Sequence, residues 1–295
     1  MAKKRRRKQA KRSGGLIGTL RQRLLALALA GLLGAGWYAH EVYVARPAMS
    51  WQGVPQSTLG GLTHWSAHVL RNPGFMLAYS EWKAAPLWVT YRLYVPENGG
   101  YRVGKRPPFR ADWRTLRHIT PDDYRNSGYN RGHMAPNYAI AKLYGREAQR
   151  ATFLMSNIAP QRSRLNQKLW QRIEEAAMDH FVKLFRELWV VTGPVWDEKP
   201  RYMKTAWIDV PDAFYKIFIG IDRAGQPHAL AFIVPQTVRG YEPLSRFVVS
   251  IDQVEQRTGL DFFWRLPDAQ EIRLERASQP QAFKLHRVDR RRPRY

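Results

Sequence analysis

The 295-residue chain contains no cysteine. Thiolate zinc sites, iron–sulfur clusters, cysteine nucleophiles and disulfide bonds are therefore excluded. A chain without thiols also suits an oxidising compartment. The sequence shows no internal repeat, and no low-complexity tract lies outside its two basic ends.

Acidic residues are scarce: 24 Asp and Glu stand against 48 Lys and Arg, which gives a net charge of +24. This balance argues against an ordinary neutral cytosolic enzyme of small metabolites. It predicts a polyanionic partner, which is nucleic acid, anionic lipid or an acidic glycan. With 44% hydrophobic and 13% aromatic residues, the chain is too apolar for a disordered protein and can bury a sizeable core.

The first 23 residues carry ten of the cations and no acid. The other 38 cations against 24 acids still leave residues 24–295 with a net charge of +14. A nuclear-localisation or nucleic-acid-binding tail would explain the cations of residues 1–23, but not the apolar run that follows them.

That run covers residues 24–39 without a charge, and including residues 40–44 it reaches 21 residues. About 20 residues are needed to cross a bilayer. A buried core helix would rarely follow ten cations, so we favour a transmembrane signal anchor over residues 24–44, with a cleaved signal peptide as the alternative. The positive-inside rule then predicts residues 1–23 to be a cytoplasmic tail and the remaining chain to be exported, which means a periplasmic location.

The rest of the chain is predicted to form one α+β domain of roughly 200 residues. A Pro/Gly/Ser-containing linker over residues 45–72 precedes the domain at residues 73–272, and a basic tail follows over residues 273–295. Runs of β-branched and aromatic residues predict strands at 87–95, 188–192 (stopped by Gly193-Pro194), 213–221 and 229–234. Helical periodicity predicts helices at 146–154, 163–185 and 245–259.

One histidine has an unusual context, the run Gly128-Tyr129-Asn130-Arg131-Gly132-His133-Met134-Ala135-Pro136. The glycines permit sharp turns. Arg131 offers a cation for a phosphate beside His133, a group able to take a proton near neutral pH. Alone, the pattern is weak, because a single histidine is more often structural.

A second cluster joins Ser156-Asn157-Ile158-Ala159-Pro160-Gln161 to Asn166 and Glu174. Asn166 begins the predicted long helix, where an Asn is usually an N-cap, but its amide oxygen also suits Mg²⁺. Glu174 lies about 12 Å further along the helix, so its side chain reaches the metal's water shell rather than the metal. A surface salt bridge is an equal explanation for Glu174.

Together, these clusters resemble the DNA/RNA non-specific endonuclease family, the endonuclease G-like ββα-metal nucleases. The resemblance runs from about Asn72 to Phe263, and several motifs occur in the family's order. These motifs are Pro73-Gly74-Phe75, Trp88-Val89-Thr90-Tyr91, SGYNRGHMAP, S-N-x-x-P-Q, N-x-x-x-W-x-x-x-E and Val191-Thr192-Gly193-Pro194.

The resemblance implies an α+β fold with a mixed or antiparallel sheet and a catalytic ββα element. It also implies roles for single residues. His133 would be the general base, Asn166 the sole protein ligand of Mg²⁺ (with Mn²⁺ as a substitute) and Arg131 a phosphate contact. Glu174 would order the metal's water shell, and Asn157 would support the site from the neighbouring loop.

Position 130 departs from the family, whose motif usually opens with Asp. Compared with Asp, Asn130 keeps a carbonyl acceptor of the same shape but lacks the negative charge. We expect Asn130 to lie beside the bound substrate. Since every other element is retained, an active enzyme is still expected.

The predicted function is hydrolysis of phosphodiester bonds in DNA and RNA, with 5′-phosphate products implied by the resemblance. Contact with phosphate rather than bases predicts weak sequence preference. The alternative is an exported nucleic-acid-binding or DNA-uptake protein with an inactive nuclease fold. A membrane-surface protein is a third possibility, but it leaves the middle of the chain unexplained. The sequence does not determine the oligomeric state.

Overall fold

The computed structural model describes residues 2–197 and 199–293, with side chains from residue 19 onward. The chain divides into two compact units, Met1–Ala48 and Met49–Tyr295, which are treated separately below.

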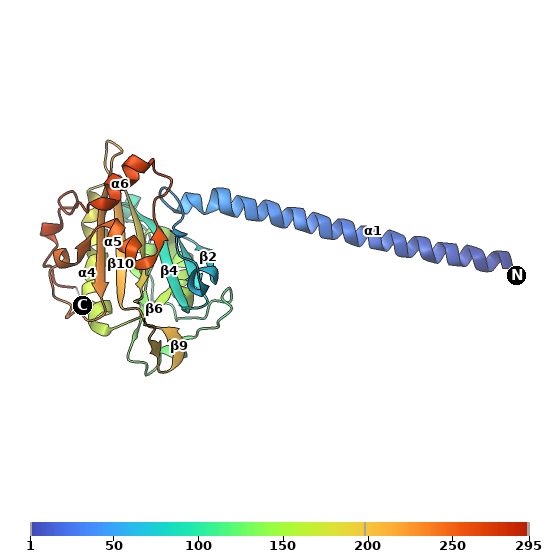
Figure 1. Ribbon diagram of the computed structural model, residues 1–295, viewed down its shortest axis with the longest axis horizontal. Helices are drawn as coiled ribbons and strands as arrows, with labels where there is room; N and C mark the ends of the chain where they lie inside the picture. Colours follow the sequence, from blue (N-terminus) through green and yellow to red (C-terminus); the bar gives the residue numbers. More distant parts are fainter. Residues whose placement is uncertain (1, 198, 294–295) are drawn as a thin grey trace. The chain divides into compact units, whose positions relative to one another are not determined.

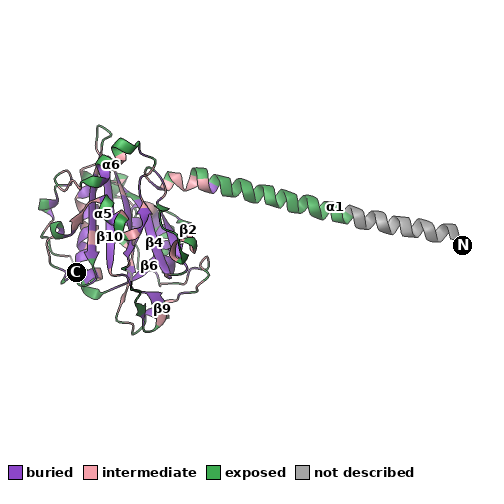
Figure 2. Cartoon of the chain, in the orientation of Figure 1, coloured by how far each residue is buried: buried purple, intermediate pink, exposed green. Residues whose placement is uncertain are grey.

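The first unit is helical. Helix α1 (Ala2–His40) continues into a π-helical turn, Glu41–Ala45. From residue 19 onward, the large apolar side chains of α1 are exposed, as the green stretch in Figure 2 shows. By length and composition, Thr19–Met49 forms a helix able to cross a membrane, and signal sequences share these properties. Most of the predicted basic tail, residues 1–23, lies outside the residues whose side chains are described.

The second unit is built on a seven-stranded sheet in the order β12-β11-β10-β7-β4-β3-β2. Strands β10, β4 and β2 of this sheet are labelled in Figure 1. Every neighbouring pair of strands is antiparallel. The strands are β2 (Ala67–Asn72), β3 (Phe75–Ser80), β4 (Ala85–Leu93), β7 (Glu187–Val195), β10 (Ala213–Ile221), β11 (Pro227–Pro235) and β12 (Val248–Val249). The predicted α+β class and the four predicted strands are confirmed.

We had predicted that this strand stops at Gly193-Pro194, but strand β7 continues to Val195. Its pairing with β4 ends at Thr192, while its pairing with β10 continues to Val195. Beyond Thr192 one edge of β7 has no strand partner, so Pro194 costs the sheet no ladder hydrogen bond on that side. Gly193 is required by close packing, since a Cβ there would lie 2.3 Å from the Leu87 carbonyl oxygen.

Both faces of the sheet are covered. In β10, Phe214 and Phe218 join the core beneath the central helices, whereas Ile217 and Ile219 join a second core on the opposite face. The central helices are α3 (Asn137–Thr152) and α4 (Gln171–Asp179), and the second core packs against α5 (Ile251–Thr258) and α6 (Asp268–Arg276). Short elements complete the unit: α2 (Leu62–Trp65) and the strand pairs β1 (Gln56–Ser57) with β13 (Leu260–Asp261) and β8 (Tyr202–Met203) with β9 (Ala206–Asp209).

A small hairpin carries the predicted site. Strand β5 (Asn130–His133) pairs antiparallel with β6 (Ile158–Gln161), with α3 inserted between them. After β6 the chain enters a π-helical turn, Leu165–Trp170, which runs directly into α4. Apart from the inserted α3, the order is therefore strand, strand, helix. The helix that we predicted over 163–185 is divided into this turn, α4 and a 3₁₀ turn at Phe181–Lys183.

Two predicted boundaries differ from the structure. We expected residues 45–72 to be a linker, but the second unit begins at Met49 and residues 67–72 form the edge strand β2. We expected residues 273–295 to be a basic tail, yet Phe283, Leu285 and Val288 are buried in the core beneath the central helices. These apolar side chains hold the C-terminal segment on the domain.

Candidate active site

His133 ends strand β5. Its ring packs between Phe109 and Phe153, with ring centroids 5.4 and 4.9 Å away. Its Nε2 atom is buried and has no hydrogen-bond partner among the described residues. Burial, reinforced by the charge of Arg106, lowers the pKa of His133 to about 3. The imidazole is therefore neutral near pH 7.

Gly128 and Gly132 serve different purposes around this histidine. Gly128 has φ of +82°, a turn conformation that favours glycine. Gly132 is needed for packing instead, because a Cβ there would lie 2.2 Å from Oε1 of Gln161.

Asn157 fixes the loop that follows His133. Its side chain is completely buried, and its Oδ1 accepts a hydrogen bond from the Ala135 N–H. Its Nδ2 donates to the carbonyl oxygens of Ala135 and Thr152, each at 3.0 Å. Asn157 therefore lies behind the site and connects the two strands of the hairpin to the end of α3.

Asn166 lies in the π-helical turn rather than at the helix N-cap. The capping position belongs to Arg164, and the backbone N–H of Asn166 donates to the Arg162 carbonyl. No hydrogen bond of the Asn166 side chain is found among the described residues, so its amide is available for a ligand. Single π-helical turns are frequent at functional sites.

Glu174 lies on α4, with its Oε1 buried and without a hydrogen-bond partner. The nearest cation is Nζ of Lys216, 3.8 Å away. Burial raises the pKa of Glu174, and Lys216 opposes this effect. The surface-salt-bridge explanation does not fit, because the partner lysine is fully buried.

Sequence reasoning missed Lys216. It lies on β10, donates to the Tyr91 hydroxyl at 3.3 Å and lies 4.5 Å from the centroid of the Trp170 ring. Burial lowers the pKa of its ammonium group, and Glu174 opposes this effect. A lysine in the middle of the apolar strand 213–221 was the available signal, because an unpaired cation there would be costly.

Arg131 and Asn130 lie on the same strand. The Arg131 guanidinium donates through Nη2 and Nε to the Pro121 carbonyl at 2.5 and 3.2 Å, and stacks 5.3 Å from the Phe109 ring. Asn130 accepts a hydrogen bond from Ser163 at 3.3 Å, while its buried Nδ2 has no partner among the described residues. An Asp at position 130 would lack this donor.

These side chains meet in one groove of about 1180 Å³. His133, Asn166, Glu174, Arg131 and Asn130 all line it, whereas Asn157 does not. The volume exceeds the range of roughly 300–1,000 Å³ typical of small-ligand pockets and suits an extended substrate.

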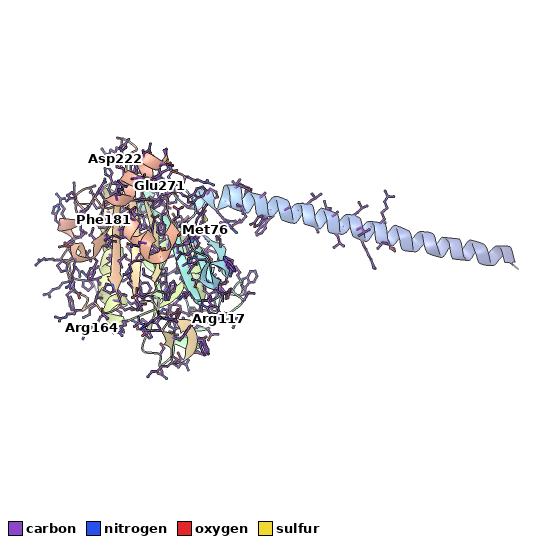
Figure 3. The ribbon with its side chains drawn as sticks, in the orientation of Figure 1. Met76, Arg117, Arg164, Phe181, Asp222 and Glu271 are labelled. Atoms are coloured by element: carbon purple, nitrogen blue, oxygen red, sulfur yellow. The ribbon has the colours of Figure 1, made fainter. Side chains whose placement is uncertain are left out.

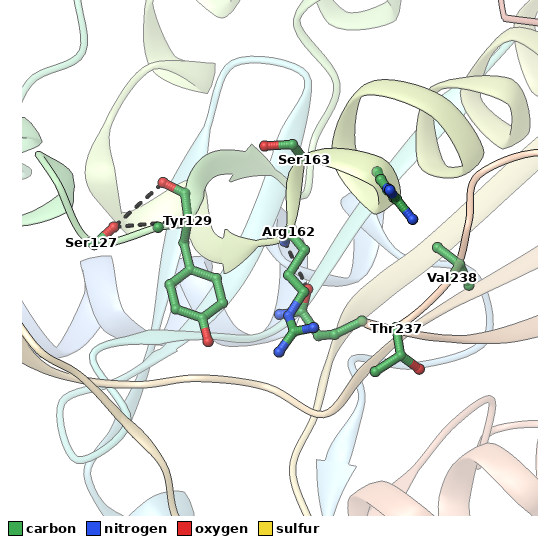
Figure 4. A pocket seen from close by; sticks show the side chains of 9 residues that line it. Ser127, Tyr129, Arg162, Ser163, Thr237 and Val238 are labelled. Atoms are coloured by element: carbon green, nitrogen blue, oxygen red, sulfur yellow. Dashed lines mark hydrogen bonds between the residues drawn. The ribbon is translucent and has the colours of Figure 1, made fainter.

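Figure 4 shows a second pocket, of about 500 Å³. It adjoins the groove, because Tyr129 lines both. Arg162 and Arg164 also line it. Within the described part of the chain, neither arginine forms an ion pair with a carboxylate. The two pockets together form a continuous surface with arginine side chains next to the candidate catalytic residues.

Residues 58–269 match the family model described as DNA/RNA non-specific endonuclease. The chain belongs to this family. It is 33% identical over 205 residues to the mitochondrial nuclease EXOG of Xenopus laevis, covering 64% of this chain and 56% of that protein. The alignment thus spans little more than half of the frog protein. The mouse EXOG is 31% identical over 280 residues, covering 84% of this chain and 74% of that protein.

A solved structure of an EndoG/EndoGI complex, described as showing the mechanism of EndoG inhibition, has the same fold. Its TM-score is 0.57 at 26% identity, covering 73% of this chain and 95% of that chain. Human mitochondrial endonuclease G is 29% identical over 209 residues, covering 66% of this chain and 69% of that protein. The predicted family is confirmed, and with it the enzyme class of nucleases. The roles of single residues stay predictions.

The donors in the groove fit a hard divalent cation. The Asn166 amide and the Glu174 carboxylate present oxygen atoms, the ligands that Mg²⁺ prefers. Oε1 of Glu174 faces the Lys216 ammonium at 3.8 Å, so Oε2 is the oxygen left for a metal's water shell. Cysteine is absent from the chain, so no soft thiolate ligand competes.

Proposed function

We propose that this protein is a metal-dependent endonuclease that hydrolyses phosphodiester bonds of DNA and RNA. The main support is that a neutral imidazole, His133, and a side-chain amide without a described partner, Asn166, line one groove on a strand–strand–helix element. Phosphodiester hydrolysis needs a base for the attacking water and a cation for the developing charge; His133 would supply the base, and Asn166 would hold the cation.

His133 is the general base in this proposal. The neutral ring lines the groove and accepts a proton from the attacking water. Burial and Arg106 lower its pKa. A bound phosphate brings negative charge beside the ring and raises that pKa toward neutrality, so the base strengthens when substrate arrives.

The remaining residues position the substrate. Asn166 would hold Mg²⁺ or Mn²⁺, with Glu174 fixing the surrounding water. When bound, the metal offsets negative charge on the phosphate and on the leaving 3′-oxygen. Arg131 contacts the phosphate through the N–H groups that Pro121 does not use. The products would carry 5′-phosphate and 3′-hydroxyl ends.

The proposed contacts are to phosphate, so sequence preference is weak. No step requires a 2′-hydroxyl, and both DNA and RNA are therefore substrates. Arg162 and Arg164 extend the phosphate path into the adjoining pocket.

We further propose that residues 24–44 anchor the protein in a membrane, with the nuclease domain extracytoplasmic and, in a bacterium, periplasmic. The length and composition of the N-terminal helix support this location. A cleaved signal peptide with release into the periplasm is the alternative.

The test compares plasmid DNA and RNA digestion by wild type, His133→Ala and the matched control His118→Ala, each with and without EDTA. His118 is exposed and outside both pockets. We expect EDTA to abolish cleavage, and His133→Ala to lose about 10²–10⁴-fold while binding DNA normally. Full activity of His133→Ala in excess EDTA would refute the mechanism. A wild type that binds DNA but cleaves nothing with Mg²⁺ or Mn²⁺ would instead support the inactive DNA-binding alternative.

A further inference from the structure

An acidic cluster lies on helices α5 and α6, away from the groove. Asp252 and Glu255 lie on α5, Asp261 on β13, and Glu271 and Glu275 on α6 (Glu271 is labelled in Figure 3). The chain has twice as many cations as acids. Even so, none of these five carboxylates forms an ion pair within the described residues.

Three of the carboxylates converge. Oxygen atoms of Asp252, Glu255 and Glu275 all lie within 4.8 Å of one another. Asp252 is exposed and Glu255 half-buried, whereas Glu275 is only 7% exposed. The cluster therefore has one side open to water and one buried ligand at its base.

The environment of the Glu275 carboxylate is the observation that points to a bound cation. Its Oε1 is buried and has no hydrogen-bond partner among the described residues, although its carboxylate points at the other two. Burial, reinforced by the negative charges of Glu255, Glu271, Asp252 and Asp261, raises the pKa of Glu275 to about 9. Among the described residues no cation opposes this effect. An unpartnered buried carboxylate surrounded by like charges is costly unless a proton or a cation neutralises it.

We propose that Asp252, Glu255 and Glu275 bind one Ca²⁺ ion that ties α5 to α6. Ca²⁺ takes six to eight oxygen ligands, accepts bidentate carboxylates and completes its shell with water. Three carboxylates with an open side match this requirement. Mg²⁺ is commonly held by one or two carboxylates and keeps several waters, so it fits less well.

One ligand is already partly fixed by the fold. Oε1 of Glu255 accepts a hydrogen bond from the Phe262 N–H at 2.8 Å, which holds this carboxylate in place and leaves Oε2 for the cation. Both helices pack on the second core, through Val254 of α5 and Leu274 of α6. Ca²⁺ binding would therefore stabilise the domain without contact with the catalytic groove.

The test uses the full chain, purified in detergent, with the Asn166→Ala substitution to remove the proposed catalytic metal site. Calorimetric titration with CaCl₂ should give one site. Thermal unfolding should shift upward by about 5–10 °C when free Ca²⁺ is a hundredfold above Kd. Adding Glu275→Gln should weaken Ca²⁺ binding at least ~10-fold, as for a lost metal contact. The control Glu147→Gln, at an exposed position on α3, should leave binding unchanged.

Asp252→Asn provides a second variant at an exposed position, in case Glu275→Gln does not fold, and it should also weaken Ca²⁺ binding. Two results would overturn the proposal. One is a protein with Asn166→Ala alone whose unfolding temperature does not change with Ca²⁺. The other is a calcium-dependent shift in unfolding temperature that persists with Glu275→Gln and with Asp252→Asn. Stabilisation by acid alone, without a calcium effect, would show that protons neutralise the cluster instead. Because no readout uses cleavage, failure of the proposed nuclease function would not affect this result.

Discussion

The ammonium group of Lys216 lies 3.8 Å from the Glu174 carboxylate, beneath the candidate active site. Lys216 comes from the central strand β10 and Glu174 from helix α4, so the pair links the sheet to the helix that carries the site. The two groups shift each other's pKa in the direction that favours both charges. Lys216 is therefore positioned to favour the ionised form of Glu174 against the effect of burial.

Replacing this lysine tests that relationship. Lys216→Met removes the cation but keeps an unbranched side chain, so the pKa of Glu174 should rise further. We expect activity at pH 7 to fall by about 10–100-fold, as for other residues that support a metal site indirectly. Since a raised carboxyl pKa requires higher pH for ionisation, the acid limb of the pH–activity profile should move to higher pH and activity should partly recover there.

The exposed Lys183→Met is the matched control and should leave the profile unchanged. A Lys216→Met enzyme with reduced activity but an unshifted pH profile would indicate a purely structural role. Circular dichroism and thermal unfolding would establish whether the variant folds.

Local patterns explain why part of this architecture was predictable. Strands β4, β10 and β11 are continuous apolar runs, and the motif order around His133 and Asn166 identifies the family. Lys216 was missed because its partner lies 42 positions earlier, and only packing of α4 on β10 brings the two together. Strand β2 was hidden by the Pro/Gly/Ser-containing sequence before it, and its place in the sheet depends on pairing with β3.

The C-terminal segment shows the same limit. Its charge pattern is that of a solvated tail, while three buried apolar residues decide its position. The acidic cluster was also invisible in the sequence, because strand β13 and a turn lie between the helix that carries Asp252 and Glu255 and the helix that carries Glu275. In each case, contacts between distant segments outweigh local composition.

Asp112 links pH to the stability of the site. It is 1% exposed, accepts hydrogen bonds from Arg114 at 2.7 and 2.9 Å and accepts one from Ser156, next to Asn157, at 2.6 Å. Burial alone would raise the pKa of Asp112, but the hydrogen bonds from Arg114 and Ser156 outweigh it and lower the pKa below 3.8. A lowered carboxyl pKa stabilises the fold above the unfolded value, and this contribution is lost as the pH falls through the folded value.

We therefore expect Asp112→Asn to destabilise the domain by about 1.5–3 kcal/mol at pH 7, the range for hydrogen bonds to charged groups. The difference from wild type should narrow as the pH falls below about 4, because the wild-type carboxylate becomes protonated first in the unfolded chain and then, below its lowered pKa, in the fold. Urea unfolding at several pH values measures it. Asp122→Asn is the control, because the Asp122–Arg125 pair is exposed and such pairs contribute little. If Asp112→Asn lowered the free energy of unfolding equally at pH 7 and pH 3, the electrostatic explanation would be contradicted.

The adjoining pocket makes a prediction about salt. If Arg162 and Arg164 each neutralise one phosphate of duplex DNA, each alanine substitution should reduce the slope of log affinity against log salt by about 0.9. The loss of affinity should be similar for DNA of unrelated sequences, since phosphate contacts carry no sequence information. Fluorescence anisotropy with catalytically inactive His133→Ala protein measures the slope. Arg223→Ala, in the exposed turn between β10 and β11, should not change it. Slopes that stay constant for both pocket variants would place the DNA elsewhere.

The final prediction concerns membrane topology. Ten cations and no acid precede residue 24, so residues 1–23 should remain in the cytoplasm while the domain crosses the membrane. This orientation would also keep a non-specific nuclease away from the cell's own genome. Protease added outside spheroplasts should digest the domain, and alkaline carbonate should leave the uncleaved chain in the membrane fraction. A shortened, soluble periplasmic product would indicate a signal peptide and preserve the export prediction. A full-length soluble protein in the cytoplasm would refute both, because neither an anchor nor a signal peptide leaves the intact chain on that side of the membrane.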